Sequence, residues 1–204
     1  MRFITLSHSW ICLQSLPVLF DRRLRALLDS REDDAVWEAY GETWCIMATD
    51  LSGFSRGVAE LGIVHYLRII LESERMLVPI LERHNGVLLK VEGDSLFVIF
   101  ARVQDALHAA IEMQRATRRW NEGKPLPEQM LLGLGLGYGR VIRAGPSDVY
   151  GNEVNSACVL GETFARGYDV LVTQAVRDQA QDLAFEPFQP VPPGAGAAYK
   201  LIVE

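Results

Sequence analysis

The chain has 204 residues, a length that predicts one domain with at most a short appendage. Hydrophobic residues make up 49% and charged residues 23%, which suits an ordinary globular core. The net charge of −6 leaves no basic excess to neutralise phosphates, so a general nucleic-acid binder is disfavoured. A small anionic ligand, which needs only local amides and a metal ion, is not excluded.

The cysteines and the apolar segments indicate the cellular compartment in which the protein is expected. The three cysteines, Cys12, Cys45 and Cys158, are odd in number and widely spaced, which argues against a disulfide framework or a zinc site and favours a reducing cytoplasm. No stretch reaches the ~18 consecutive apolar residues of a membrane span. The shorter apolar segment Trp10–Phe20 lacks a basic flank, so it is expected to pack on the domain or a partner rather than to act as a signal peptide.

Residues 1–42 are predicted to form a helical lead-in, and residues 43–204 the main domain. One helix is expected at Leu19–Leu28. A second runs to Tyr40, capped by Asp33 or Asp34, with Gly41 expected in the left-handed conformation at its end.

Apolar periodicity predicts the elements of the main domain. Helices are expected at Ile63–His84, Asp105–Trp120, Asn152–Phe164 and Gln174–Gln181, the last capped by Thr173. Strands are expected at Trp44–Thr49, Val87–Val91, Ser95–Phe100, Met130–Tyr138, Val141–Ala144, Val170–Thr173 and Ala198–Val203. The second and third strands form a hairpin with Glu92-Gly93-Asp94 at its tip, and Val141–Ala144 is expected to pair with Met130–Tyr138. This order predicts an α+β fold, a ferredoxin-like mixed sheet with helices packed on a face.

Leucine alternates with glycine in the strand that contains Gly133, Gly135 and Gly137. Because side chains alternate between the faces of a strand, one face there carries only glycine. Such a face is typical of a close approach by a helix or by another subunit.

Two carboxylates, Asp50 and Asp94, each stand where an apolar strand gives way to a glycine-containing turn. Either alone is structural more often than not, because aspartate is common in turns. Together they suggest that both side chains meet and hold a divalent metal ion for chemistry on a nucleoside triphosphate. The segment Leu51-Ser52-Gly53-Phe54-Ser55 follows the first aspartate and opens a helix whose N–H groups can face an anion.

Four motifs in this order resemble the class III nucleotidyl cyclases, and the resemblance looks closest to small stand-alone bacterial members and covers about 44–180. The motifs are Asp50–Ser55, Lys90–Asp94, Gly133–Gly139 and Asp148–Asn155. The resemblance implies two Mg²⁺ or Mn²⁺ ions held by Asp50, Asp94 and the backbone carbonyl of Leu51. It also implies that residues 51–55, which are Leu51, Ser52, Gly53, Phe54 and Ser55, cradle the triphosphate.

The same resemblance implies how the base and the ribose are held. Lys90 matches a donor to a ring nitrogen and Asp148 an acceptor from an exocyclic amine, which fits adenine and favours conversion of ATP to cAMP. Asn155 matches the residue that orients the ribose. The family builds its site between two subunits, with the metal aspartates on one chain and Lys90, Asp148 and Asn155 on the other, so a homodimer is implied and a lone chain should be inactive.

Alternatives remain open. Cytosine presents the same acceptor–donor edge as adenine, so a pyrimidine cyclase like those of bacterial antiphage signalling fits the pair, with UTP fitting less well than CTP. Large side chains near Met47, Phe54 or Leu89 would shrink the room for a purine. Lys90 could also be a solvated strand residue, and Asn155 could bond within its own helix.

Two departures from the family pattern favour a further alternative, a catalytically attenuated regulatory dimer that binds nucleotide. Val159 occupies the position of the usual arginine four residues after Asn155, and Val191–Gly194 lacks the usual triphosphate lysine. Substitutes for these groups are sought among three basic residues, Arg140, Arg143 and Arg166. A diguanylate-cyclase-like domain is disfavoured because its Gly-Gly-Asp/Glu-Glu-Phe signature does not occur.

Overall fold

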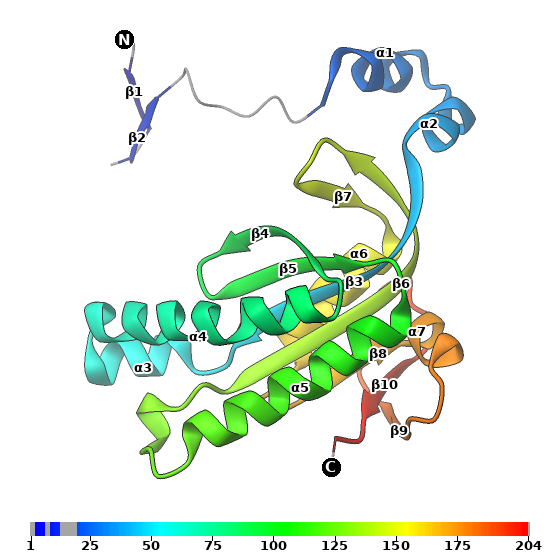
Figure 1. Ribbon diagram of the computed structural model, residues 1–204. Coiled ribbons are helices and arrows are strands. Elements are labelled where there is room, and N and C mark those ends of the chain that lie inside the picture. The colour runs from blue at the N-terminus through cyan, green and yellow to red at the C-terminus, as the bar shows by residue number, and fades with distance from the viewer. Residues whose placement is uncertain (1–2, 7–8, 13–19, 204) are drawn as a thin grey trace.

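The computed structural model describes residues 3–6, 9–12 and 20–203 (Figure 1). An eight-stranded sheet runs in the order β4-β5-β3-β6-β8-β10-β9, with β7 paired to β6. The strands are β3 (Gly41–Leu51), β4 (Val87–Glu92), β5 (Ser95–Phe100), β6 (Leu132–Ala144), β7 (Asp148–Tyr150), β8 (Val170–Thr173), β9 (Phe185–Phe188) and β10 (Ala198–Leu201). The sheet is mixed, because β6 and β8 run parallel while β3 is antiparallel to both of its neighbours.

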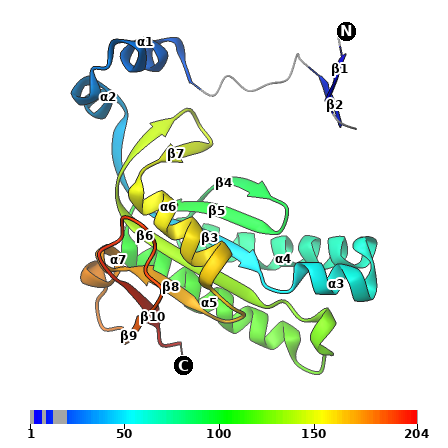
Figure 2. The same cartoon turned by 180° about the vertical axis from the view of Figure 1, so that it is seen from behind.

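Helices lie on both faces of this sheet. Those of the main domain are α3 (Phe54–Leu61), α4 (Ile63–Arg83), α5 (Val103–Asn121), the 3₁₀ turn η1 (Leu126–Glu128), α6 (Asn152–Cys158), the π-helix η2 (Val159–Phe164) and α7 (Gln174–Gln179). Figures 1 and 2 show α4 and α5 on one face and α6 on the other. The predicted α+β mixed sheet is confirmed.

The alternation of side chains along β3 divides the core into two parts. Cys45 and Met47 are fully buried in the larger cluster, under α4 and α5. Ile46 points to the opposite face and packs with Val154 of α6. Burial of each such aliphatic side chain stabilises the fold by roughly 1.5–3 kcal/mol, so both helix layers hold β3 in place.

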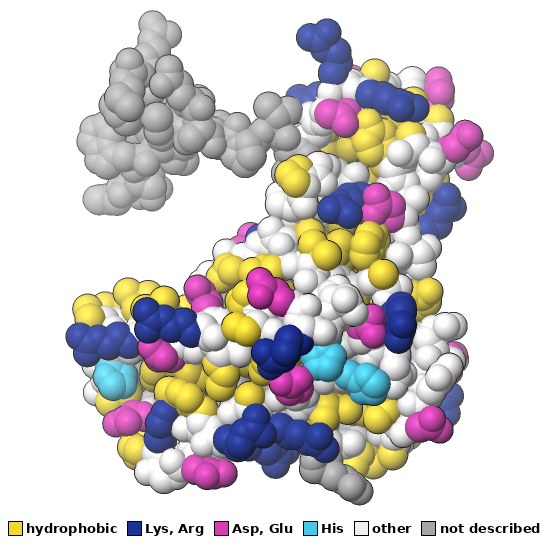
Figure 3. All heavy atoms as spheres, in the orientation of Figure 1, with side chains coloured by type: hydrophobic (Ala, Val, Ile, Leu, Met, Phe, Trp, Pro, Cys, Tyr) yellow, Lys and Arg dark blue, Asp and Glu magenta, His cyan; other side chains and the backbone are white. Residues whose placement is uncertain are grey.

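The outer face of α5 is basic. Its inward residues, such as Leu107 and Met113, are fully buried, while Arg115, Arg118 and Arg119 are exposed. Basic side chains accordingly gather along the lower surface in Figure 3. This is the division of faces expected from the spacing of the helix.

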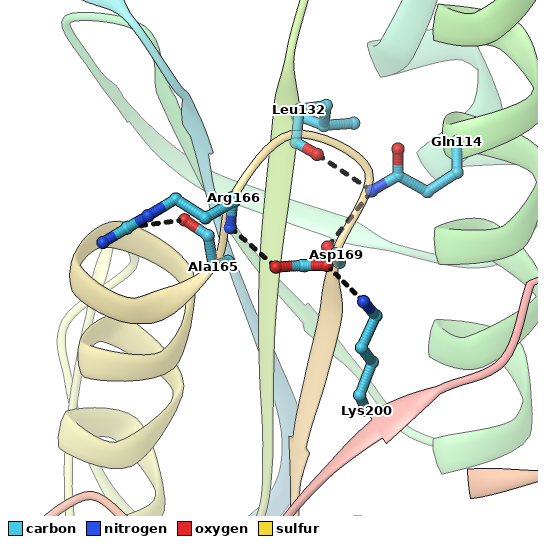
Figure 4. Close-up of polar contacts among 6 residues, drawn as sticks. All are labelled: Gln114, Leu132, Ala165, Arg166, Asp169 and Lys200. Carbon is cyan, nitrogen blue, oxygen red and sulfur yellow. Dashed lines mark hydrogen bonds and ion pairs between the residues drawn. The ribbon is translucent and has the colours of Figure 1, made fainter. Parts of the chain in front are cut away.

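One buried polar network ties α5 to the sheet (Figure 4). The buried Nε2 of Gln114 donates to the carbonyl oxygens of Leu132 at 3.0 Å and Asp169 at 3.2 Å. The Asp169 carboxylate accepts from the backbone N–H of Arg166 at 2.9 Å and pairs with Lys200 Nζ at 2.8 Å. Helix α5, strand β6, the entry to β8 and strand β10 are thereby joined through two side chains.

The glycine face of β6 is covered by α6 and η2. A Cβ added at Gly135 would overlap the backbone of Ala157 and Gly161, and one at Gly137 would overlap the carbonyl oxygen of Glu153. A Cβ at Gly133 would lie 2.9 Å from that of Ala165. The predicted close approach of a helix to this face is confirmed.

Most of the predicted helices and strands are confirmed, with small shifts of their ends. The lead-in forms α1 (Arg22–Ser30) and α2 (Asp33–Tyr40), which pack against Ala144 at the end of β6. The predicted Leu19–Leu28 helix therefore starts later, and Leu19 lies outside the described residues. The boundary between a 1–42 lead-in and a 43–204 domain stays a prediction, although β3 starts at Gly41.

Four predictions of local structure were wrong. Neither Asp33 nor Asp34 caps α2, because both lie inside its first turn and Glu32 stands at the N-cap without a side-chain hydrogen bond. Gly41 is extended at φ −75° rather than left-handed, and glycine is required there because a Cβ would overlap the carbonyl of Trp37. Val141–Ala144 does not pair with the preceding segment but continues the same strand β6, whose local partner is β7. The Thr173 hydroxyl does not cap α7, because it donates to Glu153 instead.

Strands β1 (Phe3–Leu6) and β2 (Ser9–Cys12) pair antiparallel with each other. The apolar segment Trp10–Phe20 falls largely outside the described residues, so its packing stays a prediction. Within the described part of the chain, no helix has the length and apolar character needed to span a membrane.

Candidate active site

The end of β3 and the β4–β5 turn bring Asp50 and Asp94 together. Strands β3 and β5 pair through Ala48 and Phe97, and the next step is closed by the Leu96 N–H, which donates to Thr49 Oγ1 at 2.9 Å. Asp50 follows Thr49, and Asp94 sits in the turn just before β5. Gly93, at φ 63°, supplies the left-handed residue that this tight turn requires.

The two carboxylates share a poorly solvated environment. Burial, together with the nearby charges of Asp94 and Glu162, raises the pKa of Asp50 to about 6. Burial also raises the pKa of Asp94. Its Oδ2 is buried and has no hydrogen-bond partner within the described structure. Two desolvated carboxylates, one with an orphaned oxygen, are groups that a hard divalent cation would stabilise.

These residues would supply only part of a metal site. Among the described residues, no group of three or more His, Cys, Asp or Glu side chains could hold a metal ion by itself. Asp50, Asp94 and the carbonyl of Leu51 would supply part of an oxygen shell. Phosphate oxygens, which Mg²⁺ and Mn²⁺ accept readily, would supply the rest.

The segment after Asp50 is arranged partly as predicted for a phosphate loop. Gly53, at φ 96°, stands at the N-cap of α3 with no side-chain cap, so the first N–H groups of that helix have no side-chain acceptor from the cap position. The Ser52 N–H is not available to an anion, because it donates to the carbonyl oxygen of Leu131 at 2.8 Å. The side chains of Phe54 and Ser55 lie outside the described ones.

A separate cavity of about 220 Å³ gathers the other predicted residues, since Lys90, Asp148 and Asn155 all line it. Lys90 Nζ lies 3.6 Å from Asp148 Oδ1 and 3.2 Å from Glu92 Oε1. Burial lowers the pKa of Lys90, but the Glu92 and Asp148 carboxylates outweigh it and the net shift is upward. Lys90 is therefore held as a cation at the cavity wall, within reach of Asp148.

The aspartate pair and this cavity are neighbours but distinct. Neither Asp50 nor Asp94 lines the cavity. Glu162 connects the two regions, since it lines the cavity and its charge raises the pKa of Asp50. One chain thus presents a carboxylate pair and, beside it, a pocket whose lining includes the Lys90 cation, the Asp148 carboxylate and the Asn155 amide.

The structure places several further residues here, for which the sequence predicted no role. Glu92, Cys158 and Glu162 line the cavity with Lys90. Tyr66 is 4% exposed, and burial followed by the charges of Asp94 and Asp50 raises its pKa. Glu162 could have been found from its position seven residues, or about two helical turns, after Asn155. Tyr66 gave no comparable signal, because it reads as part of the apolar face of its helix.

Among the described side chains, no arginine lines the cavity to replace the missing basic groups. Val159 begins η2, where the helix changes from α to π geometry. Arg140 donates to the Trp37 carbonyl at 3.1 Å. Arg143 and Arg166 are also held elsewhere, on Glu42 at 3.4 Å and on the Thr163 carbonyl at 3.0 Å.

Of the residues expected near the base, Met47 does not line the cavity. It is fully buried under α4 and α5, on the other face of the sheet. Leu89 packs against the buried cluster that contains Ile46 and Ile99, and it does not line the cavity.

No protein-family profile matches the chain. Among curated proteins, it is 25% identical over 131 residues to the serine/threonine-protein kinase pkn2 of Myxococcus xanthus, covering 64% of this chain and 16% of that protein. It is 27% identical over 133 residues to "Putative adenylate cyclase 3" of Rhizobium meliloti (strain 1021), covering 65% and 22%. The chain thus spans less than a quarter of the length of the curated relatives it matches.

Solved structures resemble the chain over a larger share of its length than the curated proteins do. An adenylate/guanylate cyclase/hydrolase from Silicibacter pomeroyi is 23% identical with a TM-score of 0.69, covering 80% of this chain and 98% of that one. The adenylyl cyclase CyaB from P. aeruginosa is 16% identical with a TM-score of 0.66, covering 79% and 94%. The guanylate cyclase domain of RhGC from Catenaria anguillulae, in complex with GTP, is 14% identical with a TM-score of 0.68, covering 79% and 97%. The resemblance predicted from the four motifs is confirmed at the level of the fold, and the chain has the class III adenylate/guanylate cyclase fold.

Proposed function

We propose that this chain is a nucleotidyl cyclase that converts a nucleoside triphosphate into a 3′,5′-cyclic nucleoside monophosphate and pyrophosphate. The observation that carries the proposal is the Lys90–Asp148 pair, 3.6 Å apart in one cavity with Asn155. The same chain carries the desolvated Asp50–Asp94 pair beside that cavity. Base recognition and metal binding are the two functions that such a reaction needs from the protein.

Asp50, Asp94 and the Leu51 carbonyl would hold two Mg²⁺ or Mn²⁺ ions, which when bound lower the pKa of a ribose 3′-hydroxyl and offset triphosphate charge. The first turn of α3 and the Ser52 hydroxyl would orient the phosphates. Asn155 would hydrogen-bond the ribose and keep its 3′-oxygen in line with the α-phosphorus. Correct alignment of reacting atoms is itself a large part of such catalysis.

A homodimer with interfacial sites would bring the two half-sites together. The cavity contains no metal-binding aspartate of its own chain. In the proposed dimer, Asp50 and Asp94 of one protomer face the cavity of its partner, giving two equivalent sites. A monomer would then bind nucleotide weakly and turn none over.

ATP is the favoured substrate. Lys90 can donate to adenine N1 while Asp148 accepts from the N6 amine, and the charge-assisted character strengthens both bonds. CTP is the alternative, because cytosine N3 and N4 present the same order of acceptor and donor, whereas the edge of UTP is reversed.

An attenuated, regulatory nucleotide-binding dimer is the second candidate, and a specific observation favours it. Val159 replaces a charged donor, and the three arginines that could compensate are each held outside the cavity. Loss of one such donor typically lowers the rate roughly 10²–10³-fold.

The test is to incubate the purified protein separately with ATP, GTP, CTP and UTP in Mn²⁺ and to separate cyclic products by chromatography. ATP should give the highest rate, and Asp94→Asn should abolish it. A CTP rate above that of ATP would replace the adenine assignment with the pyrimidine one. No cyclic product from any triphosphate would refute a cyclase and leave the attenuated binder.

Mixing two inactive variants tests the dimer. Asp94→Asn and Asn155→Ala disable opposite halves of an interfacial site, so their heterodimers contain one intact site. Random exchange should restore about a quarter of wild-type activity, because half of the dimers are mixed and each has one good site of two. If no activity returns although the subunits exchange, the proposal of an active site formed between two protomers is refuted.

A further inference from the structure

Glu153 makes a contact that the proposed chemistry does not use. It lies on α6, two residues before Asn155, and its carboxylate faces the sheet. Oε2 accepts a hydrogen bond from the backbone N–H of Tyr138 at 3.0 Å and another from Thr173 Oγ1 at 2.7 Å. A single oxygen thus joins α6 to β6 and to the end of β8.

The Tyr138 N–H needs this partner because of a gap in the sheet. Strand β8 pairs with β6 only through Leu134–Leu136, and β7 pairs with it only through Ile142–Ala144. Between these stretches, β6 has no strand on that side. The Glu153 carboxylate fills the gap and satisfies an amide that would otherwise lack a protein partner.

The glycines of β6 make room for this side chain. A Cβ added at Gly139 would lie 2.9 Å from Cγ of Glu153, and one at Gly137 would overlap the Glu153 carbonyl oxygen. Two glycines of β6, Gly137 and Gly139, therefore leave the space that Glu153 occupies.

Helix α6 has few other means to fix its first turn. It runs only from Asn152 to Cys158, and Gly151 at its N-cap offers no side-chain hydrogen bond. Asn155 lies one turn from this uncapped end, with its side chain on the cavity. Val154 and Ala157 pack the helix against the sheet, and Glu153 adds the hydrogen bonds that hold its first turn to β6 and β8. The Glu153 contact therefore helps to set where Asn155 stands.

We propose that Glu153 is a positioning residue for Asn155, which places the ribose-binding amide by locking α6 to the open stretch of β6. The inference rests on the proposed function of Asn155. Glu153 touches no reacting atom in this account and acts through its neighbour.

A double-mutant cycle tests the coupling. Glu153→Ala should lower kcat about 10–100-fold with KM little changed, because misplacement by ~1 Å costs up to about 10²-fold. In the Asn155→Ala background the same change should cost less than about 3-fold, since its target is gone. Glu153→Gln should stay near wild type, because an amide oxygen can accept both hydrogen bonds. Asn152→Ala, an exposed change in the same helix turn, is the matched control.

Additive losses in the cycle would overturn the inference, as would a Gln variant no better than the Ala variant. Thermal unfolding of every variant separates loss of fold from loss of position. If Glu153→Ala does not fold, Thr173→Val serves in its place, because it removes one of the two donors to the Glu153 carboxylate. Thr173→Val should lower kcat less than Glu153→Ala would, and this loss of kcat must also vanish in the Asn155→Ala background.

A readout besides turnover distinguishes failure of this inference from failure of the proposed function. Calorimetry measures binding of the α,β-methylene analogue of ATP to the same four proteins. If the wild type makes no cyclic product but binds the analogue, the cyclase proposal fails and the coupling is judged from binding. A wild type that neither reacts nor binds overturns both, whereas an active wild type with an additive cycle overturns only the role of Glu153.

Discussion

Removing the charge of Asp50 should stabilise the metal-free protein. In the folded chain this carboxyl is half-buried beside Asp94, and its pKa rises from 3.8 to about 6. The folded state therefore binds more protons than the unfolded chain between these values. The free energy of unfolding therefore falls as the pH rises through that window, and the destabilisation by the ionised Asp50 carboxylate is fully present at pH 7. Asp50→Asn, which is nearly isosteric, removes the charge and keeps the shape.

The size of the gain follows from the shift. A rise from 3.8 to about 6 corresponds to at most about 3 kcal/mol at pH 7, at 1.36 kcal/mol per unit. Solvent screens a half-buried group, so the expected gain is about 1 kcal/mol. That is roughly 2–4 °C in Tm for a chain of this length. At pH 5, midway through the window, the gain should shrink to about half.

Thermal unfolding in EDTA at pH 7 and pH 5 measures these gains for wild type and Asp50→Asn. Saturating Mn²⁺ should reverse the order, because the metal stabilises the folded wild type by about 2.7 kcal/mol at 100 times its Kd and the variant by less. A variant that is less stable than wild type in EDTA at pH 7 would refute the reasoning. So would a variant that gains as much from Mn²⁺ as the wild type does.

Other substitutions test the pocket and the packing. Val159→Arg should raise kcat about 10²–10³-fold by supplying a cationic donor near the α-phosphate; unchanged product formation would show that this position does not face it. Asp148→Asn should lower kcat/KM for ATP about 10-fold, by weakening a charge-assisted acceptor, while leaving Mn²⁺-induced stabilisation intact; equal losses for ATP and GTP would contradict base reading. Gly135→Ala should lower the free energy of unfolding, measured in urea, by about 3 kcal/mol or more, because the added Cβ overlaps the backbone of α6 and η2. Gly196→Ala is the control and should cost under about 1 kcal/mol, because its Cβ meets only the flexible end of a glutamine side chain. Similar costs for both variants would refute the packing argument.

The sequence predicted the elements well because most carry a strong local period. The 3.6-residue spacing between Ile63 and Arg83 and the hairpin with Gly93 at its turn are local features, and both are present. The prediction failed where long-range geometry decides. Strand β6 runs straight through Gly139, because the whole of β3 pairs with it between Leu132 and Ile142. A local pattern cannot reveal a partner ninety residues away.

The site shows the same division. The order of the motifs predicted that Lys90, Asp148 and Asn155 lie close together, and they line one cavity. It did not predict that the Ser52 N–H donates to a backbone carbonyl, or that the charge of Glu162 raises the pKa of Asp50. Those contacts depend on how η1 and η2 pack, which no single motif encodes.

Strand β4 has a consequence for solubility. It is the outermost strand of the sheet, with Val87 at 45% and Val91 at 41% exposure. An open edge with apolar side chains invites pairing with other chains, and proteins protect such edges with lysines and β-bulges. Here the register shifts between Leu88 and Lys90, and the edge carries two charged side chains, Lys90 and Glu92. Substitutions of Lys90 designed to change the base will therefore also remove the positive charge of this edge and leave Glu92 as its charged residue, so redesign of the pocket should restore a lysine at a neighbouring position of β4.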